Sequence, residues 1–135
     1  MAKKKALKTL VNESDERTAH FGMYKVEDSD RHVHLDLFPG ATGQSAISTV
    51  KLESTTLVRE QEGSIEDLDL GTNAELRGQE MTIYTLVTDV SHDTDLTTLD
   101  MILKGGVEEY SISLKRTVQS QGDSVGYKIT ILFFQ

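Results

Sequence analysis

The sequence predicts an antiparallel two-sheet β-sandwich of about eight strands, with a closed β-barrel as the alternative. Short segments in which apolar and polar residues alternate recur along the chain, and polar or glycine-containing loops separate them. Helical periodicity is almost absent. Residues 81–90 are apolar on both faces, which indicates a central strand covered on two sides and favours the sandwich over the barrel.

The first half of the chain is expected to contain three well-separated strands. A strand at residues 6–11 follows a basic tail at residues 1–5, which we expect to be disordered. A second strand is predicted at residues 18–26, where Gly22 interrupts the pattern and indicates a bulge. Residues 32–38 alternate cleanly and predict a half-buried strand. One face of this strand carries Val33, Leu35 and Leu37, and the other carries His32, His34 and Asp36.

The middle of the chain is less regular. Residues 46–58 are rich in β-branched side chains, which indicates either one long strand or two shorter ones. The pattern weakens between residues 59 and 79, where we expect a long connection. Single helical turns at residues 64–67 and 73–78 are consistent with their capping residues.

The last part of the chain carries four candidate strands in succession, at residues 81–90, 96–104, 107–118 and 125–134. Gly105 and Gly106 can both adopt positive φ, so they predict a two-residue hairpin turn. This turn would pair Met101 with Tyr110 and keep the apolar side chains on one face. A second hairpin is predicted across residues 119–124. The predicted core contains Val33, Leu35, Leu37, Leu99, Met101, Tyr110, Ile112, Leu114, Ile129 and Ile131.

Length and charge limit the class of protein. The 135 residues suit one domain, expected at residues 6–135, and the formal net charge is −8. An acidic body with one short basic tail argues against nucleic-acid binding. No apolar segment is long enough to span a bilayer and no signal peptide is recognisable, so we expect a cytoplasmic protein, with leaderless export left open. The absence of cysteine excludes disulfides and thiolate sites.

Two short motifs suggest chemistry at first sight. Residues 122–126 match the G-x-S-x-G pattern around Ser124, but a strand follows them and no acid or histidine comes later in the chain. His32, His34 and Asp36 would share one face of a strand, where a metal ion could bind, although a solvated sheet face explains them as well. We therefore predict that the protein is not an enzyme.

The acidic loops provide the candidate metal site. Carboxylates from several loops of a sandwich can together bind calcium. Because successive loops alternate between the two ends, the loops at residues 12–17, 39–45, 91–95 and 119–124 are expected to share one end. The predicted calcium ligands are Asp15, Asp93, Asp95 and Asp123. Calcium is the one cofactor that the sequence suggests.

The last strand suggests how the protein acts. Its final residues are apolar on both faces, and Leu132 and Phe134 lie opposite the core-facing row. Such a segment favours pairing with another chain if it is exposed. We therefore predict a non-catalytic interaction or self-assembly module that forms a homo-oligomer, or binds a protein partner, through Leu132 and Phe134. The alternative is a ligand-binding sandwich that uses calcium or a small-molecule pocket.

Overall fold

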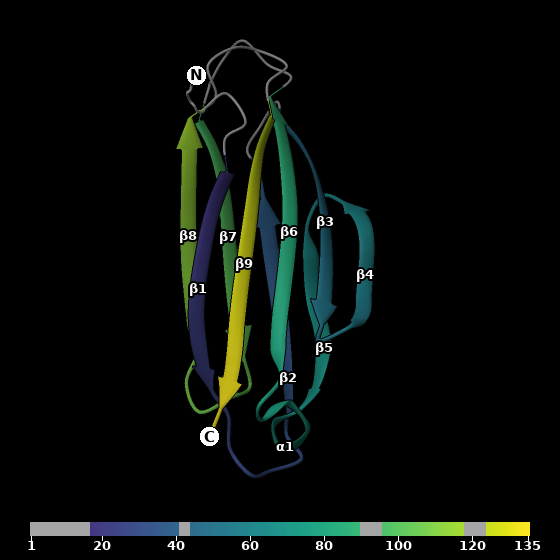
Figure 1. Ribbon diagram of the computed structural model, residues 1–135, viewed down its shortest axis with the longest axis vertical. Coiled ribbons are helices and arrows are strands. Elements are labelled where there is room, and N and C mark those ends of the chain that lie inside the picture. Colours follow the sequence, from purple (N-terminus) through teal and green to yellow (C-terminus); the bar gives the residue numbers. More distant parts are fainter. Residues whose placement is uncertain (1–16, 41–43, 90–95, 118–123) are drawn as a thin grey trace, which may run out of the picture.

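The computed structural model describes residues 17–40, 44–89, 96–117 and 124–135. Within them the chain forms nine strands and one short helix, arranged as two sheets packed face to face (Figure 1). The elements are β1 (Arg17–Lys25), β2 (His32–Pro39), β3 (Gln44–Leu52), β4 (Thr55–Glu62), β5 (Ile65–Thr72), α1 (Asn73–Leu76), β6 (Glu80–Asp89), β7 (Leu96–Lys104), β8 (Tyr110–Thr117) and β9 (Ser124–Phe134). The two sheets form no closed barrel, and the predicted β-sandwich is confirmed.

Sheet A has the strand order β1-β9-β6-β3-β4, and sheet B has the order β5-β2-β7-β8. All neighbouring strands are antiparallel except β1 and β9, which run parallel. No helix in the described parts of the chain is long and apolar enough to cross a membrane.

The core lies between the inner faces of the two sheets. Alternate residues of β7 and β9 are buried, as the period of two in their sequences requires. Seven of the ten predicted core residues are completely buried. The other three are Tyr110, Ile112 and Leu114, which are half-buried because β8 is an edge strand.

One inner row of sheet A is polar. Ser48 and Thr85 are buried neighbours whose hydroxyls lie 2.8 Å apart. Tyr127 continues the row, and its hydroxyl lies 2.6 Å from the Thr97 hydroxyl on sheet B. This contact ties the two sheets together inside the core. Thr18 Oγ1, at the edge of the same row, is buried and has no hydrogen-bond partner among the described residues.

The middle of the chain contains one more strand than the pattern suggests. β3 and β4 are separate strands, joined by a tight turn at which Glu53 has a φ of 52°. The helical turn expected at residues 64–67 is wrong, because these residues enter β5. The alternation in β5 is disturbed by irregular pairing with β2, and Asp67 has a φ of 57°. The turn expected at residues 73–78 is confirmed as α1, which is capped by Thr72.

The hairpin at the two glycines has the predicted faces and a different register. Met101 pairs with Ile112 instead of Tyr110, a shift of two residues that keeps the apolar side chains on the inner face. Gly105 has a φ of 100°, whereas Gly106 is not among the residues with positive φ. A Cβ at Gly106 would lie 2.5 Å from the Tyr24 ring, and one at Gly105 would collide with the backbone of β2. The two glycines therefore allow close packing instead of forming a two-residue turn.

Two other expectations about strand pairing are wrong. β8 pairs with β7 in sheet B, whereas β9 lies between β1 and β6 in sheet A, so β8 and β9 form no hairpin. Their apolar rows therefore contribute to the core from two different sheets. Gly22 marks no bulge either, because β1 pairs with β9 without a register shift. Gly22 leaves room for the Tyr110 hydroxyl, with which any Cβ would collide.

The strand ends confirm part of the expected arrangement of loops. The start of β1 and the ends that flank residues 41–43, 90–95 and 118–123 lie at one end of the sandwich (Figure 1). Because successive loops alternate between the two ends, dividing residues 46–58 into two strands would by itself have moved the later loops to the opposite end. The additional strand β5 restores the expected arrangement.

Candidate interaction surface

The outer faces of the two sheets differ in chemistry. Seven large apolar side chains of the described residues are exposed, and five of them lie on the outer face of sheet A. The exposed fractions on this face are 61% for Phe21, 49% for Met23, 41% for Ile47, 45% for Tyr84 and 49% for Leu86. The remaining two are Leu96, at the start of β7, and Val107, in the β7–β8 loop.

The strand register gathers these side chains into two groups. Met23 on β1 lies directly beside Leu132 on β9, and Lys25 lies beside Phe134. We call Phe21, Met23, Leu132 and Phe134 the apolar strip. Leu86 on β6 lies beside Ile47 on β3, and Tyr84, two residues before Leu86 in β6, lies on the same face. The strip and this second group belong to one continuous sheet surface.

A shallow hollow of about 390 Å³ lies on the same face, at Gly126. Gly126 pairs with Leu86 and contributes no side chain, so the floor of the hollow is backbone. Lys128 borders it, with its Nζ 5.7 Å from the centre of the Tyr84 ring, which is within the range of a cation–π contact. The face therefore combines apolar surface with one cationic side chain.

The outer face of sheet B is ionic instead. Asp36 on β2 is only 9% exposed and accepts hydrogen bonds from Lys104 Nζ at 2.8 Å and from the Asp67 backbone N–H at 2.7 Å. The hydrogen bond from Lys104 is the main reason that the pKa of Asp36 lies below its ordinary value. These contacts tie β2 to both of its neighbours, β7 and β5.

His32 belongs to a second ion pair on this face. Its Nδ1 lies 2.8 Å from the Asp69 carboxylate, and this hydrogen bond raises the pKa of His32. The described residues contain no group of three or more potential ligands placed to hold a metal ion. Within the part of the chain that the structure describes, Asp36 and His32 instead pair with Lys104 and Asp69 on the outer face of sheet B.

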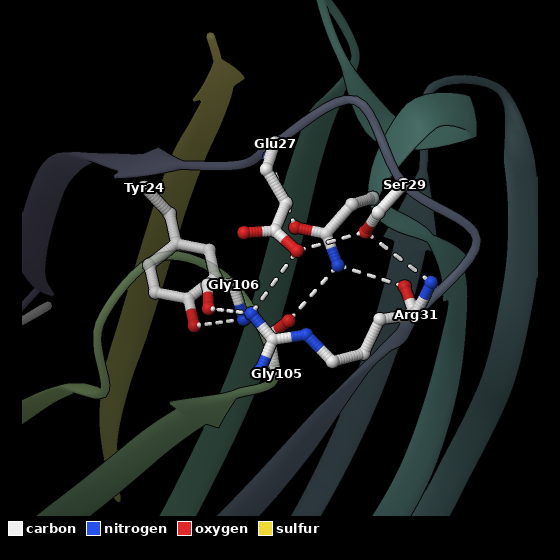
Figure 2. A network of polar contacts seen from close by, with 7 residues as sticks. Tyr24, Glu27, Ser29, Arg31, Gly105 and Gly106 are labelled. Atoms are coloured by element: carbon white, nitrogen blue, oxygen red, sulfur yellow. Dashed lines mark hydrogen bonds and ion pairs between the residues drawn. The ribbon is translucent and has the colours of Figure 1, made fainter.

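A buried asparagine connects the loops at the opposite end of the sandwich, where β1 leads into β2. Figure 2 shows its partners Glu27, Arg31 and Gly105 in the surrounding polar network. Asn73 is completely buried, and its side-chain amide donates to the carbonyls of Arg31 at 2.7 Å and Gly105 at 2.9 Å. Its Oδ1 accepts from the Glu27 N–H at 3.1 Å. One side chain thus joins the β1–β2 loop, the β7–β8 loop and α1.

Arg31 and Tyr24 hold the same two loops together. The Arg31 guanidinium donates to the Gly106 carbonyl at 2.7 Å and lies 3.3 Å from the Glu27 carboxylate. The Tyr24 hydroxyl accepts from the Gly106 N–H at 2.8 Å, and burial is the main reason that its pKa is raised. This network connects the end of β1 and the β1–β2 loop to the β7–β8 loop.

Two of the residues predicted to act in function lie on the surface described here. Leu132 and Phe134 project from β9 on the outer face of sheet A and are half-buried. The predicted calcium ligands Asp15, Asp93, Asp95 and Asp123 lie outside the described residues. Ser124 begins β9, and its hydroxyl lies 2.8 Å from the Thr88 hydroxyl.

The sequence reasoning missed most of the exposed apolar side chains. Residues 81–90 were expected to be covered on both sides, but Tyr84 and Leu86 are 45% and 49% exposed. Their apolar outer row was the available signal, and it marks open surface instead of a second core. Phe21 and Met23 were missed because the irregular pattern around Gly22 hid their common face.

Comparisons of the chain with protein-family models, with curated proteins and with solved structures found no match.

Proposed function

We propose that this chain is a non-catalytic self-assembly module that buries the outer face of sheet A against a second copy. The concentration of exposed apolar side chains on this one face carries the proposal. Large exposed apolar patches on a folded domain mark interaction surfaces. The outer face of sheet B instead carries the ion pairs of Asp36 and His32, so the apolar surface distinguishes sheet A from sheet B.

The expected affinity follows from the exposed area. Burying a large apolar side chain completely contributes about 1.5–3 kcal/mol. Five side chains that are 41–61% exposed therefore offer roughly 4–7 kcal/mol on each of the two copies. Association costs about 4–15 kcal/mol before any contact is counted. We therefore expect assembly to be weak and dependent on concentration, with the half-buried Leu132 and Phe134 adding to it.

The double substitution Leu132→Ser with Phe134→Ser tests this surface. Both side chains project outward from β9, so their loss removes apolar surface and leaves the inner row of β9 unchanged. We expect a lower mass in solution at equal concentration and an unchanged β-sheet circular dichroism spectrum.

A matched control is available on the other sheet. Phe38 and Ile102 are half-buried and project from the outer face of sheet B. The double substitution Phe38→Ser with Ile102→Ser should leave the mass at its parent value. Equal losses of mass in the two double variants would contradict the assignment to sheet A.

The hollow at Gly126 supports a second candidate, a ligand-binding domain, and calcium stays a prediction for the acidic loops. Melting the protein with calcium and with EDTA separates the two candidates, because a ligand that binds only the folded state raises the melting temperature. A calcium-dependent rise together with a monomeric mass would favour ligand binding. Asp93→Asn with Asp95→Asn should then abolish that rise.

A further inference from the structure

The two open edges of the sandwich are built differently. One edge is formed by β4 and β5, and the other by β1 and β8, which lie beside each other (Figure 1). The β4/β5 edge contains non-glycine residues with positive φ, at Glu60 and Asp67, and irregular register in both strands. Acidic side chains follow it at Glu60, Glu62, Glu66, Asp67 and Asp69. Bulges and charges of this kind prevent edge-to-edge pairing.

The β1/β8 edge has no register shift, no residue with positive φ and no acidic side chain among the described residues, and its charges are basic, at Arg17, Lys25, Lys115 and Arg116. β1 pairs with β9, and β8 with β7, in unbroken register. Neither strand contains an aspartate or a glutamate, although the chain has a net charge of −8. Two acidic copies repel each other least where acid is absent, so this edge is the favourable place for a second copy to approach.

The hydrogen bonds at the end of β1 show which backbone groups face this edge. The N–H of Val26 donates to the Phe134 carbonyl on β9, whereas the Lys25 carbonyl accepts from Val107 in the β7–β8 loop. Backbone groups alternate in direction along a strand. The N–H and C=O groups of Ala19, Phe21 and Met23 therefore point away from β9, toward the open edge.

We propose that β1 pairs antiparallel with β1 of a second copy, around a two-fold axis at Phe21. Phe21 then pairs with Phe21 of the second copy, and Met23 pairs with Ala19. This register uses the outward-facing backbone groups of Ala19, Phe21 and Met23, and it stops at Lys25 because that carbonyl already has a partner. Continuing the pairing would place Arg17 opposite Lys25 of the second copy, and two like charges opposite each other also limit it to the segment between them. The two five-stranded sheets become one continuous sheet.

The edge contact extends the proposed self-assembly and does not require the face contact. It is isologous, since the same three residues meet their own counterparts. A chain with one contact through a sheet face and another through a strand edge assembles beyond a dimer. The apolar strips of the two copies also meet along the junction, because Phe21 and Met23 belong to both the edge and the strip.

Single cysteines test the register, and the chain has no cysteine of its own. In a hydrogen-bonded antiparallel pair, opposite Cα atoms lie about 5.5 Å apart, which suits a disulfide. Phe21→Cys should therefore form a covalent dimer under mild oxidation. Met23→Cys is the matched control, because the two copies of residue 23 would be offset by roughly 13 Å along the strands. We expect at least tenfold less cross-linking for Met23→Cys, and efficient heterodimers from a mixture of Ala19→Cys and Met23→Cys.

Other results would overturn the edge contact. Equal cross-linking of the Phe21→Cys and Met23→Cys variants would indicate random collisions. An oligomeric parent with no cross-linking at Phe21→Cys would mean that association occurs elsewhere. Adding Leu132→Ser and Phe134→Ser to Phe21→Cys separates the two contacts: preserved cross-linking supports an independent edge contact, and its loss contradicts that independence. A β-sheet spectrum equal to that of the parent confirms folding of each variant.

Discussion

Replacing Asn73 by alanine should destabilise the fold more than most single changes outside the apolar core. Asn73 is completely buried, and its side chain makes three hydrogen bonds to backbone groups of Arg31, Gly105 and Glu27 (Figure 2). Alanine leaves two carbonyls and one N–H without this partner. The backbone N–H of residue 73 keeps its bond to the Arg31 carbonyl at 2.8 Å, so one of those carbonyls stays partly satisfied.

The loss of stability in Asn73→Ala can be estimated from the two backbone groups that lose their side-chain partner completely. Each buried polar group without a partner costs about 1–3 kcal/mol. The Gly105 carbonyl and the Glu27 N–H together therefore give a loss of roughly 2–6 kcal/mol in the free energy of unfolding. For a domain of this size, the melting temperature should fall by about 10–15 °C.

Urea unfolding at one fixed protein concentration measures this loss, because self-assembly would otherwise change the apparent stability. Ser29→Ala is the control: Ser29 belongs to the same network and donates to the Glu27 carboxylate near the surface, so its loss should cost less than about 1 kcal/mol. If Asn73→Ala and Ser29→Ala lose the same small amount of stability, Asn73 is not what joins the two loops.

Substitutions at three further sites test other contacts. Gly106→Ala should destabilise the fold by about 1–3 kcal/mol in urea unfolding because its Cβ would overlap the Tyr24 ring; parent-like stability would contradict the close packing. Asp36→Ala should cost more than Asp36→Asn in the same assay, because only asparagine keeps an acceptor for the backbone N–H. Because the pKa of Asp36 is lower in the folded protein, Asp36 stabilises the fold at pH values above the ordinary pKa of an aspartate. This contribution is lost as the pH falls through the pKa of Asp36 in the folded protein. The pKa of His32 is raised instead, so His32 stabilises the fold at pH values below the ordinary pKa of a histidine. This contribution is lost as the pH rises through the pKa of His32 in the folded protein. Asp69→Asn should lower the pKa of His32 in an NMR titration, and an unchanged pKa would contradict the pairing.

The sequence was sufficient for the architecture because alternation with period two is a local property. Strands β2, β6, β7 and β9 could be predicted within about two residues at each end. Strand β5 could not, since Asp67 adopts positive φ and the pairing with β2 is irregular, which breaks the alternation. Assigning β8 and β9 to different sheets depends on contacts distant in the sequence, and no local pattern carries that information.

The candidate surface was only partly predictable for a related reason. An apolar row on both sides of a strand shows that two faces are apolar, but not which one the second sheet covers. This ambiguity led to Tyr84 and Leu86 being interpreted as buried, whereas Leu132 and Phe134 were correctly placed opposite the core-facing row. The glycines were ambiguous too, because Gly22 and Gly106 are required by Tyr110 and Tyr24, which are distant in the sequence.

The mass of the protein in solution tests the central proposal most directly. Sedimentation equilibrium over a range of concentrations up to high micromolar should give a mass that rises above the 15.0 kDa of one chain. The Leu132→Ser, Phe134→Ser variant should stay closer to 15.0 kDa at every concentration, while the Phe38→Ser, Ile102→Ser control follows the parent. A parent protein that stays at 15.0 kDa throughout this range would contradict self-assembly through sheet A.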